Sequence, residues 1–210
     1  LIRWIRRAEA LFYRTLELIV IGISKVICVI LGRDRAFKIY NAINSLIERN
    51  IVKDGMIFDA SSYIYLYRAQ TVFTKEPETL YWLDRNVNPG DVFYDVGANV
   101  GVFSVYAAKK RRARVFAFEP MSLNYATLNK NIATNDLGGS GNGSVIAFNV
   151  AADNETRFGA LHLSALIPGK AGHSFAPSEE FETAYKQGVF GCSLDDFVTK
   201  FGNPAPNHIK

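Results

Sequence analysis

Two acidic motifs in the second half of the chain have the residue types and spacing of a nucleoside-binding site. Asp95 stands just before a glycine-rich segment, GANVG at residues 97–101, and Glu119 lies 22 positions after Gly97. Glycines allow positive backbone angles and the close approach of a ligand to the main chain. A carboxylate at the end of a strand can accept hydrogen bonds from both hydroxyls of a ribose. Together the two motifs predict a nucleoside-containing ligand.

The spacing of the glycines favours one class of nucleoside. Dinucleotide-binding loops read G-x-G-x-x-G, whereas this segment has G-x-x-x-G between Gly97 and Gly101. A carboxylate such as Asp95 repels a pyrophosphate but attracts a sulfonium and an ammonium group. We therefore predict S-adenosylmethionine as the cofactor, with an NAD-dependent oxidoreductase as the alternative.

The elements that position these motifs follow an alternating pattern from Asp91 onward. Apolar strands alternate with amphipathic helices, which is typical of a parallel sheet with right-handed crossovers. The carboxyl ends of such strands meet at one edge, so Asp95 and Glu119 are expected to lie together. The fold class is therefore α/β, with a Rossmann-like sheet. The expected elements are strands at 92–96, 115–119 and 144–151 and helices at 102–110 and 122–135.

The segment before this sheet is predicted to hold short strands and one helix. Residues 51–60 and 62–67 look like strands, with Asp54-Gly55 as a turn within the first. A helix is expected from Glu76-Pro77 through about Asn86, since proline suits a first helical turn. The turn at 88–90 (NPG) is the predicted domain boundary. The chain is thus divided into a helical extension at 1–50, a lead-in at 51–90 and a cofactor-binding domain at 91–210.

Composition excludes several classes of protein. Of the 210 residues, 49% are hydrophobic, which is enough to bury a core. Cys28 and Cys192 stand far apart without a Cys/His cluster, so neither a disulfide scaffold nor a zinc ribbon is expected. The sequence therefore predicts no metal site and fits a reducing, cytoplasmic compartment.

Charge is unevenly distributed along the chain. Residues 1–38 hold eight basic and three acidic side chains, a net charge of +5 against +4 for the whole chain. The remainder is therefore close to neutral and offers no overall basic balance, which predicts that nucleic acid is not a partner. Residues 16–31 are the most apolar stretch of the chain. Three alternatives stay open for this N-terminal helix: packing on protein, contact with a membrane surface through residues 1–33, and spanning a membrane.

The motifs also resemble a known family. DVFYDVGANVGVFSVYAAKK, VFAFEP, LNKNIATND, VIAFNVAAD and SLDDF are similar to segments of FkbM-type S-adenosylmethionine-dependent methyltransferases, from about residue 76 to residue 210. The resemblance implies that Glu119 and Pro120 hold the ribose edge and that Glu76 or Glu78 approaches the methionine end. It implies methyl transfer to a hydroxyl of a sugar, a glycan or a secondary metabolite. The cofactor loop that it implies consists of Asp95, Gly97, Ala98, Asn99 and Gly101.

The sequence departs from the family pattern at both ends. The resemblance does not cover the first fifty residues, and the first residue is Leu1. The strand that follows SLDDF in the family would begin at residues 208–210, where the sequence ends. We therefore expect a fragment whose sheet is truncated after about three strands. A membrane-associated fragment without catalysis is the non-enzyme alternative.

The catalytic base is not assigned by the sequence. Methylation of a hydroxyl needs alignment of the reacting atoms and usually removal of a proton. The candidate bases are His162, His173 and His208. We interpret His162 as structural because it stands in an alternating stretch. His173 lies in a polar loop on the expected ligand side, and His208 is two residues from the end of the sequence.

Overall fold

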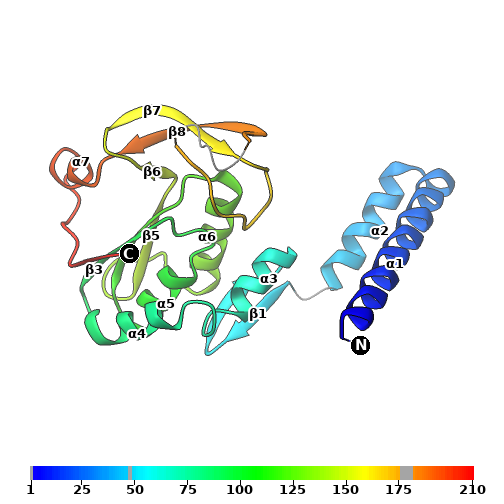
Figure 1. Cartoon of the computed structure of the whole chain (residues 1–210), viewed down its shortest axis with the longest axis horizontal. Helices are drawn as coiled ribbons and strands as arrows, with labels where there is room; N and C mark the ends of the chain where they lie inside the picture. Colours follow the sequence, from blue (N-terminus) through cyan, green and yellow to red (C-terminus); the bar gives the residue numbers. More distant parts are fainter. Residues whose placement is uncertain (1, 47–48, 176–181) are drawn as a thin grey trace. The chain divides into compact units, whose positions relative to one another are not determined.

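The computed structural model describes residues 2–46, 49–175 and 182–210, without the side chains of 2–11, 13, 17 and 44–46. It divides into two compact units, Leu1–Glu48 and Arg49–Lys210 (Figure 1). The predicted sites of cofactor binding all lie in the second unit.

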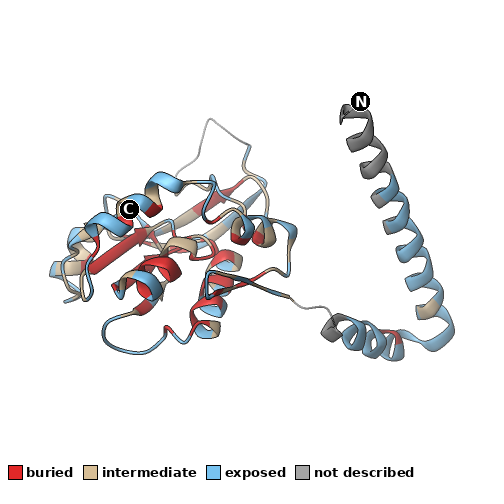
Figure 2. Cartoon of the chain, turned by 90° about the horizontal axis from the view of Figure 1, so that it is seen from below, coloured by how far each residue is buried: buried red, intermediate tan, exposed pale blue. Residues whose placement is uncertain are grey.

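The first unit consists of two helices, α1 (Ile2–Leu31) and α2 (Arg33–Leu46). Gly32 separates them with a φ of 76°, the left-handed conformation in which glycine commonly ends a helix. Most of the apolar side chains described on both helices are exposed (Figure 2). No helix in the described part of the chain is both long enough and apolar enough to cross a membrane. Whether α1 contacts protein or a membrane surface stays a prediction.

The second unit is built on a parallel four-stranded sheet with the order β5-β4-β3-β9. Its register pairs Asp95 with Ala117 and Phe118 with Phe148. A strand forms in each of the three predicted places, and β9 adds a fourth that pairs with β3 over two residues. The sheet therefore has one strand more than the three that were expected. The strands are β3 (Val92–Val96), β4 (Arg114–Phe118), β5 (Ser144–Phe148) and β9 (His208–Ile209).

Alternating side chains give the sheet two buried faces. Phe93 and Val115 belong to the core that contains residues of α4 (Pro77–Asn86), α5 (Val102–Arg111) and α6 (Ser122–Thr134). Their neighbours Tyr94, Phe116 and Phe118 point to the other face, where they pack with Phe197 of α7 (Leu194–Thr199). Because both faces are covered, the strands read as continuous apolar runs in the sequence.

A smaller sheet follows β5, with the order β6-β8-β7. The prediction of one unbroken strand at 144–151 is wrong, because Asn149 interrupts it. The Asn149 amide donates hydrogen bonds to the carbonyls of Glu119 (2.8 Å) and Pro120 (2.9 Å), and the chain then enters the second sheet. Its strands are β6 (Val150–Ala152), β7 (Arg157–Leu163) and β8 (Tyr185–Cys192).

The lead-in begins with a hairpin of β1 (Asn50–Lys53) and β2 (Met56–Asp59), as the Asp54-Gly55 turn predicts. Two asparagines next to each other on one face of the α6 segment hold it. The Asn135 side chain exchanges hydrogen bonds with the backbone N–H (2.9 Å) and carbonyl (2.6 Å) of Ile57. The Asn131 side chain accepts from Asp59 N (2.7 Å) and donates to the carbonyl of Val100 (2.8 Å). The asparagines therefore connect the hairpin to the segment that contains the predicted cofactor loop.

The strand predicted at 62–67 is wrong: this segment forms α3 (Tyr63–Gln70). The Ser62 hydroxyl accepts a hydrogen bond from Tyr65 N, the geometry of a helix N-cap. Tyr65 and Ala69, one helical turn apart, are buried, while Tyr67 is exposed. Tyrosines at every second position have the spacing typical of a strand, although this segment is helical. The signal that indicated a helix was Ser62, which caps it.

Candidate functional site

The structure brings the two predicted acidic motifs together at the carboxyl edge of the sheet. The 97–101 segment, here called the glycine loop, crosses the end of β4. The backbone N–H groups of Gly97 and Ala98 donate to the carbonyl of Phe118 at 2.9 and 3.0 Å. Asn99 N donates to Oε2 of Glu119 at 2.7 Å. Glu119 therefore fixes the glycine loop directly.

The two glycines of this loop are needed for different reasons. Gly97 has a φ of 76° with no atom near the position of a Cβ, so only its backbone angle favours glycine. Gly101 has a φ of 82°, and a Cβ there would lie 2.3 Å from Cδ1 of Leu128. Close packing between α5 and α6 thus requires the second glycine independently of any ligand.

Asp95 is fully buried and only partly satisfied. The Ser104 hydroxyl donates to Oδ2 at 2.6 Å, whereas Oδ1 has no hydrogen-bond partner in the described part of the chain. The Lys210 amino group lies 4.0 Å from Oδ1. Burial raises the pKa of Asp95, against the opposing effects of Lys210 and Ser104. A buried acceptor without a donor is costly and therefore indicates a place for a ligand donor.

Glu119 is also buried, but both of its carboxylate oxygens accept hydrogen bonds. Oε2 accepts from Asn99 N, and Oε1 accepts from Met121 N at 3.0 Å and from the Asn124 amide at 3.5 Å. Burial raises the pKa of Glu119, and these bonds act in the opposite direction. Each carboxylate oxygen has two lone pairs, so further donors can still bind. The adjacent Pro120 carbonyl accepts from the Gln187 amide at 2.6 Å.

A loop at residues 164–172 lies against this carboxyl edge. The carbonyl of Lys170 accepts from the amides of Asn99 (3.3 Å) and Asn124 (3.1 Å). Gly169 N donates to Oδ1 of Asn124 at 2.8 Å. Its carbonyl accepts from Nε (2.9 Å) and Nη2 (2.7 Å) of Arg68 in α3. Two side chains that were not predicted, Asn124 and Arg68, therefore belong to the site.

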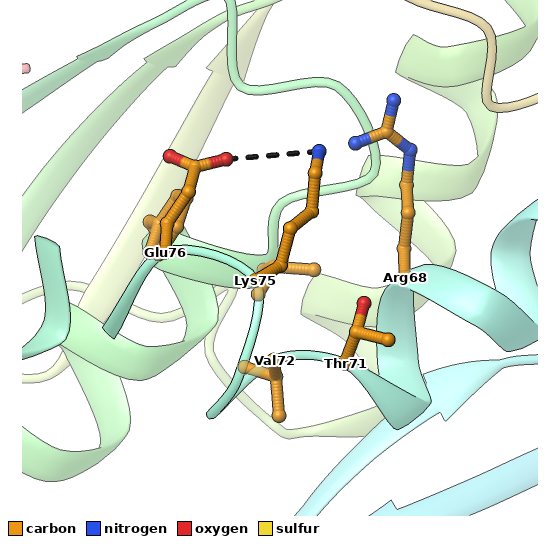
Figure 3. A pocket seen from close by; sticks show the side chains of 7 residues that line it. Arg68, Thr71, Val72, Lys75 and Glu76 are labelled. Atoms are coloured by element: carbon orange, nitrogen blue, oxygen red, sulfur yellow. Dashed lines mark ion pairs between the residues drawn. The ribbon is translucent and has the colours of Figure 1, made fainter. Parts of the chain in front are cut away.

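A pocket opens beside the start of α5 (Figure 3). Glu76, a predicted carboxylate of the methionine end, is one of its residues, whereas Glu78 is not. Lys75 pairs with Glu76 at 3.7 Å between the amino nitrogen and the carboxylate. The lining residues are Arg68, Thr71, Val72, Lys75, Glu76, Val102 and Phe103.

The three histidines have different surroundings. Nδ1 of His162 is 3.0 Å from the Thr183 hydroxyl, and Nε2 of His208 is 3.1 Å from Oδ2 of Asp91 at the amino edge of the sheet. The imidazole nitrogens of His173 have no hydrogen-bond partner among the described residues, and burial lowers its pKa. These surroundings assign no catalytic base. The described His, Cys, Asp and Glu side chains form no group of three that could hold a metal ion.

Sequence comparison finds a methyltransferase among the relatives. The chain is 31% identical to Methyltransferase sdnD from Sordaria araneosa over 148 residues, which are 69% of this chain and 54% of that protein. It is 43% identical over 70 residues to AMB antimetabolite synthetase AmbE from Pseudomonas aeruginosa, covering 32% of this chain and 3% of the synthetase. The chain thus spans about half of one relative and a small part of the other. No protein-family model matches it.

Two solved structures show partial similarity to this chain. TYW2 from P. horikoshii, solved in complex with MeSAdo, is 19% identical over 49% of this chain and 35% of its own, with a TM-score of 0.38. A tRNA m1G37 methyltransferase from M. jannaschii is 21% identical over 51% of this chain and 33% of its own, with a TM-score of 0.34. Each similarity covers about half of this chain and about a third of the solved protein.

One expectation about partners is corrected by these comparisons. The sequence predicts that nucleic acid is not a partner, yet a tRNA methyltransferase is among the similar structures. The exclusion is therefore withdrawn. Its physical weakness is that a net charge describes the composition of a segment and does not locate charge on a surface.

The predicted enzyme class and cofactor agree with the comparisons. The relative from Sordaria araneosa is described as a methyltransferase, and TYW2 from M. jannaschii was solved in complex with AdoMet. The predicted α/β fold is confirmed by the parallel sheet with helices on its faces. The chain therefore has a Rossmann-like parallel sheet and shares sequence with a methyltransferase over 148 residues.

Proposed function

We propose that this chain is the cofactor-binding part of an S-adenosylmethionine-dependent methyltransferase of the FkbM type. The observation that carries the proposal is Asp95. Its Oδ1 is buried without a hydrogen-bond partner in the described part of the chain, next to a glycine loop held by Glu119. This arrangement fits a ligand that presents a cationic donor and a ribose.

The residues present fit the charge of S-adenosylmethionine better than that of NAD. The cofactor carries a sulfonium and an ammonium group, and a buried carboxylate attracts both. A pyrophosphate near Asp95 would instead be repelled, and the G-x-x-x-G spacing lacks the third glycine of a dinucleotide loop. When bound, the cofactor supplies an electrophilic methyl group.

Each predicted site residue receives a role in this proposal. Asp95 accepts from the ammonium group, and Glu119 accepts from the ribose hydroxyls with the lone pairs that its protein donors leave free. The glycine loop, with Gly97, Ala98, Asn99 and Gly101, provides close backbone approach. Pro120 lines the ribose edge after β4. These side chains bind and orient the cofactor, while residues 91–210 form the domain that carries them.

The acceptor belongs to the same proposal. The resemblance to FkbM-type enzymes supports a hydroxyl of a sugar, a glycan or a secondary metabolite, and the similarity to Methyltransferase sdnD supports methyl transfer in general. The proposed location is the cytoplasm, because Cys28 and Cys192 are both free and a reducing compartment keeps thiols in that state.

Ligand binding tests the cofactor directly. Isothermal titration calorimetry of the protein with S-adenosylhomocysteine should give saturable binding, whereas NADH should give none at the same concentrations. A charge-neutral control is adenosine, which lacks the amino-acid end and should bind more weakly. Saturable binding of NADH without binding of S-adenosylhomocysteine would overturn the proposal in favour of the oxidoreductase alternative.

A further inference from the structure

The pocket beside α5 carries one positive charge that the described residues do not neutralise. Its cations are Arg68 and Lys75, and its only anion is Glu76. Lys75 lies 3.7 Å from the Glu76 carboxylate and forms an ion pair with it. Arg68 donates two hydrogen bonds to the carbonyl of Gly169, which is a neutral acceptor. Among the described side chains of residues 49–175 and 182–210, no carboxylate forms an ion pair with Arg68.

Arg68 is half-buried, so its charge is less well solvated than that of a surface arginine. Burial lowers the pKa of Arg68, and the negative charges of Glu119 and Glu76 raise it. Both hydrogen bonds to Gly169 use Nε and Nη2, which leaves Nη1 without a partner in the described part of the chain. Figure 3 shows Arg68 and Lys75 among the side chains that line the pocket. An anion entering this pocket would therefore gain a charge-assisted hydrogen bond.

The pocket is adjacent to the unsatisfied carboxylate of Asp95. Phe103 lines the pocket, and the Lys210 amino group lies 4.5 Å from the centre of its ring. The same amino group is 4.0 Å from Oδ1 of Asp95. The negative charge of Glu76 raises the pKa of both Asp95 and Arg68. An acceptor for a cation and a donor for an anion are thus placed next to each other.

The size of the pocket suits one end of a ligand. Its cavity volume is about 30 Å³. Pockets that hold a whole small molecule usually measure about 300–1,000 Å³. The pocket is therefore suited to an end group, and an α-amino acid end offers an ammonium and a carboxylate on one carbon.

We propose that Arg68 binds the carboxylate of the amino-acid end of S-adenosylmethionine, while Asp95 binds its ammonium group. This inference rests on the proposed function, since it names the residue that recognises one end of the cofactor. The bidentate contact with Gly169 orients the guanidinium and gives it a fixed direction of approach. Lys75 contributes less, because it is exposed and already paired with Glu76.

A ligand pair that differs only in the carboxylate tests the assignment. The probes are S-adenosylhomocysteine and its decarboxylated analogue, in which the carboxylate is replaced by hydrogen. Calorimetry of the wild-type protein should show that S-adenosylhomocysteine binds about 10- to 100-fold more tightly than the analogue. Arg68→Gln, which keeps a donor for Gly169 without the charge, should abolish this difference by weakening only S-adenosylhomocysteine. Arg68→Lys should retain part of it.

Two controls separate this role from a structural one. Arg85→Gln removes an exposed arginine that lies over Tyr81 on α4 and should leave both affinities unchanged. If Arg68 acts only by holding the 164–172 loop, Arg68→Gln will weaken both probes equally, and the proposal is overturned. Unchanged affinities for both probes overturn it as well. Failure of S-adenosylhomocysteine to bind the wild-type protein would instead refute the proposed function, and this inference with it.

Discussion

Two carboxylates at the ends of neighbouring strands, Asp95 and Glu119, have the same burial but opposite hydrogen-bonding states. Their side chains are within the protein interior, with exposures of 0% and 4%. Both oxygens of Glu119 accept from protein donors, including the backbone of Asn99 and Met121. Asp95 has one oxygen bound to Ser104 and one without a partner in the described part of the chain.

The difference separates an acid that also holds the glycine loop from an acid whose free oxygen depends on a ligand for its donor. Glu119 holds the glycine loop in place, so it contributes to the folded state before any cofactor binds. Oδ1 of Asp95 instead lacks a hydrogen-bond donor in the described part of the chain. This lowers the stability of the folded state until a ligand donates a hydrogen bond to it. The site thus combines an ordered loop with one destabilised group, a combination that is common where function opposes stability.

The largest expected effect is on stability, from Glu119→Ala. The substitution leaves the buried N–H groups of Asn99 and Met121 without an acceptor, so the free energy of unfolding should fall by about 3 kcal/mol. Urea denaturation followed by circular dichroism measures this change. Glu119→Gln keeps one acceptor oxygen, so its free energy of unfolding should fall clearly less than that of Glu119→Ala. Equal stability of Glu119→Ala and wild type would contradict the structural role of this acid.

The second effect is on binding, from Asp95→Asn. The neutral amide removes the attraction for an ammonium group, so affinity for S-adenosylhomocysteine should fall about 10- to 100-fold, or about 1.5–3 kcal/mol. Stability at neutral pH should not fall, because the variant also removes a buried charge. Calorimetry and urea denaturation are compared on the same protein. Asp195→Asn, which changes an exposed acid on α7, serves as the control. An equal loss of affinity for S-adenosylhomocysteine in this control would contradict the special role of Asp95.

The third and smallest effect is on pH dependence. Burial raises the pKa of Asp95, and the Lys210 charge and the Ser104 bond offset part of that rise. A raised pKa means that this acid's contribution to stability is fully present below its unfolded value of about 3.9 and is lost as pH rises through the folded value. Wild type should therefore lose stability relative to Asp95→Asn as the pH rises from about 4 through the raised folded pKa. Urea denaturation at several pH values measures the difference, and a constant difference would show that the pKa is not raised.

Local patterns made much of the sheet unit predictable. Strands buried on both faces read as apolar runs, and the rule that ligands bind at their carboxyl ends placed Asp95 near Glu119 from their positions in the sequence. Contacts between distant segments were not predictable in this way. Arg68 reaches Gly169 across 101 positions, from the residue that follows the strand predicted at 62–67. Asn124 was overlooked because a polar residue in a first helical turn usually faces solvent, whereas here it is buried and binds the 164–172 loop.

The paired asparagines Asn131 and Asn135 also give the second unit a path for mechanical force. β1 begins at Asn50, the second residue of that unit, so tension on the preceding chain enters the hairpin first. The hairpin strand β2 is fastened to these two side chains. The same Asn131 amide group holds the carbonyl of Val100 in the glycine loop. A pull on the N-terminal side therefore reaches the glycine loop through Asn131, while Asn135 and the ion pairs of Lys110 with Asp54 and of Lys130 with Asp59 carry part of the load.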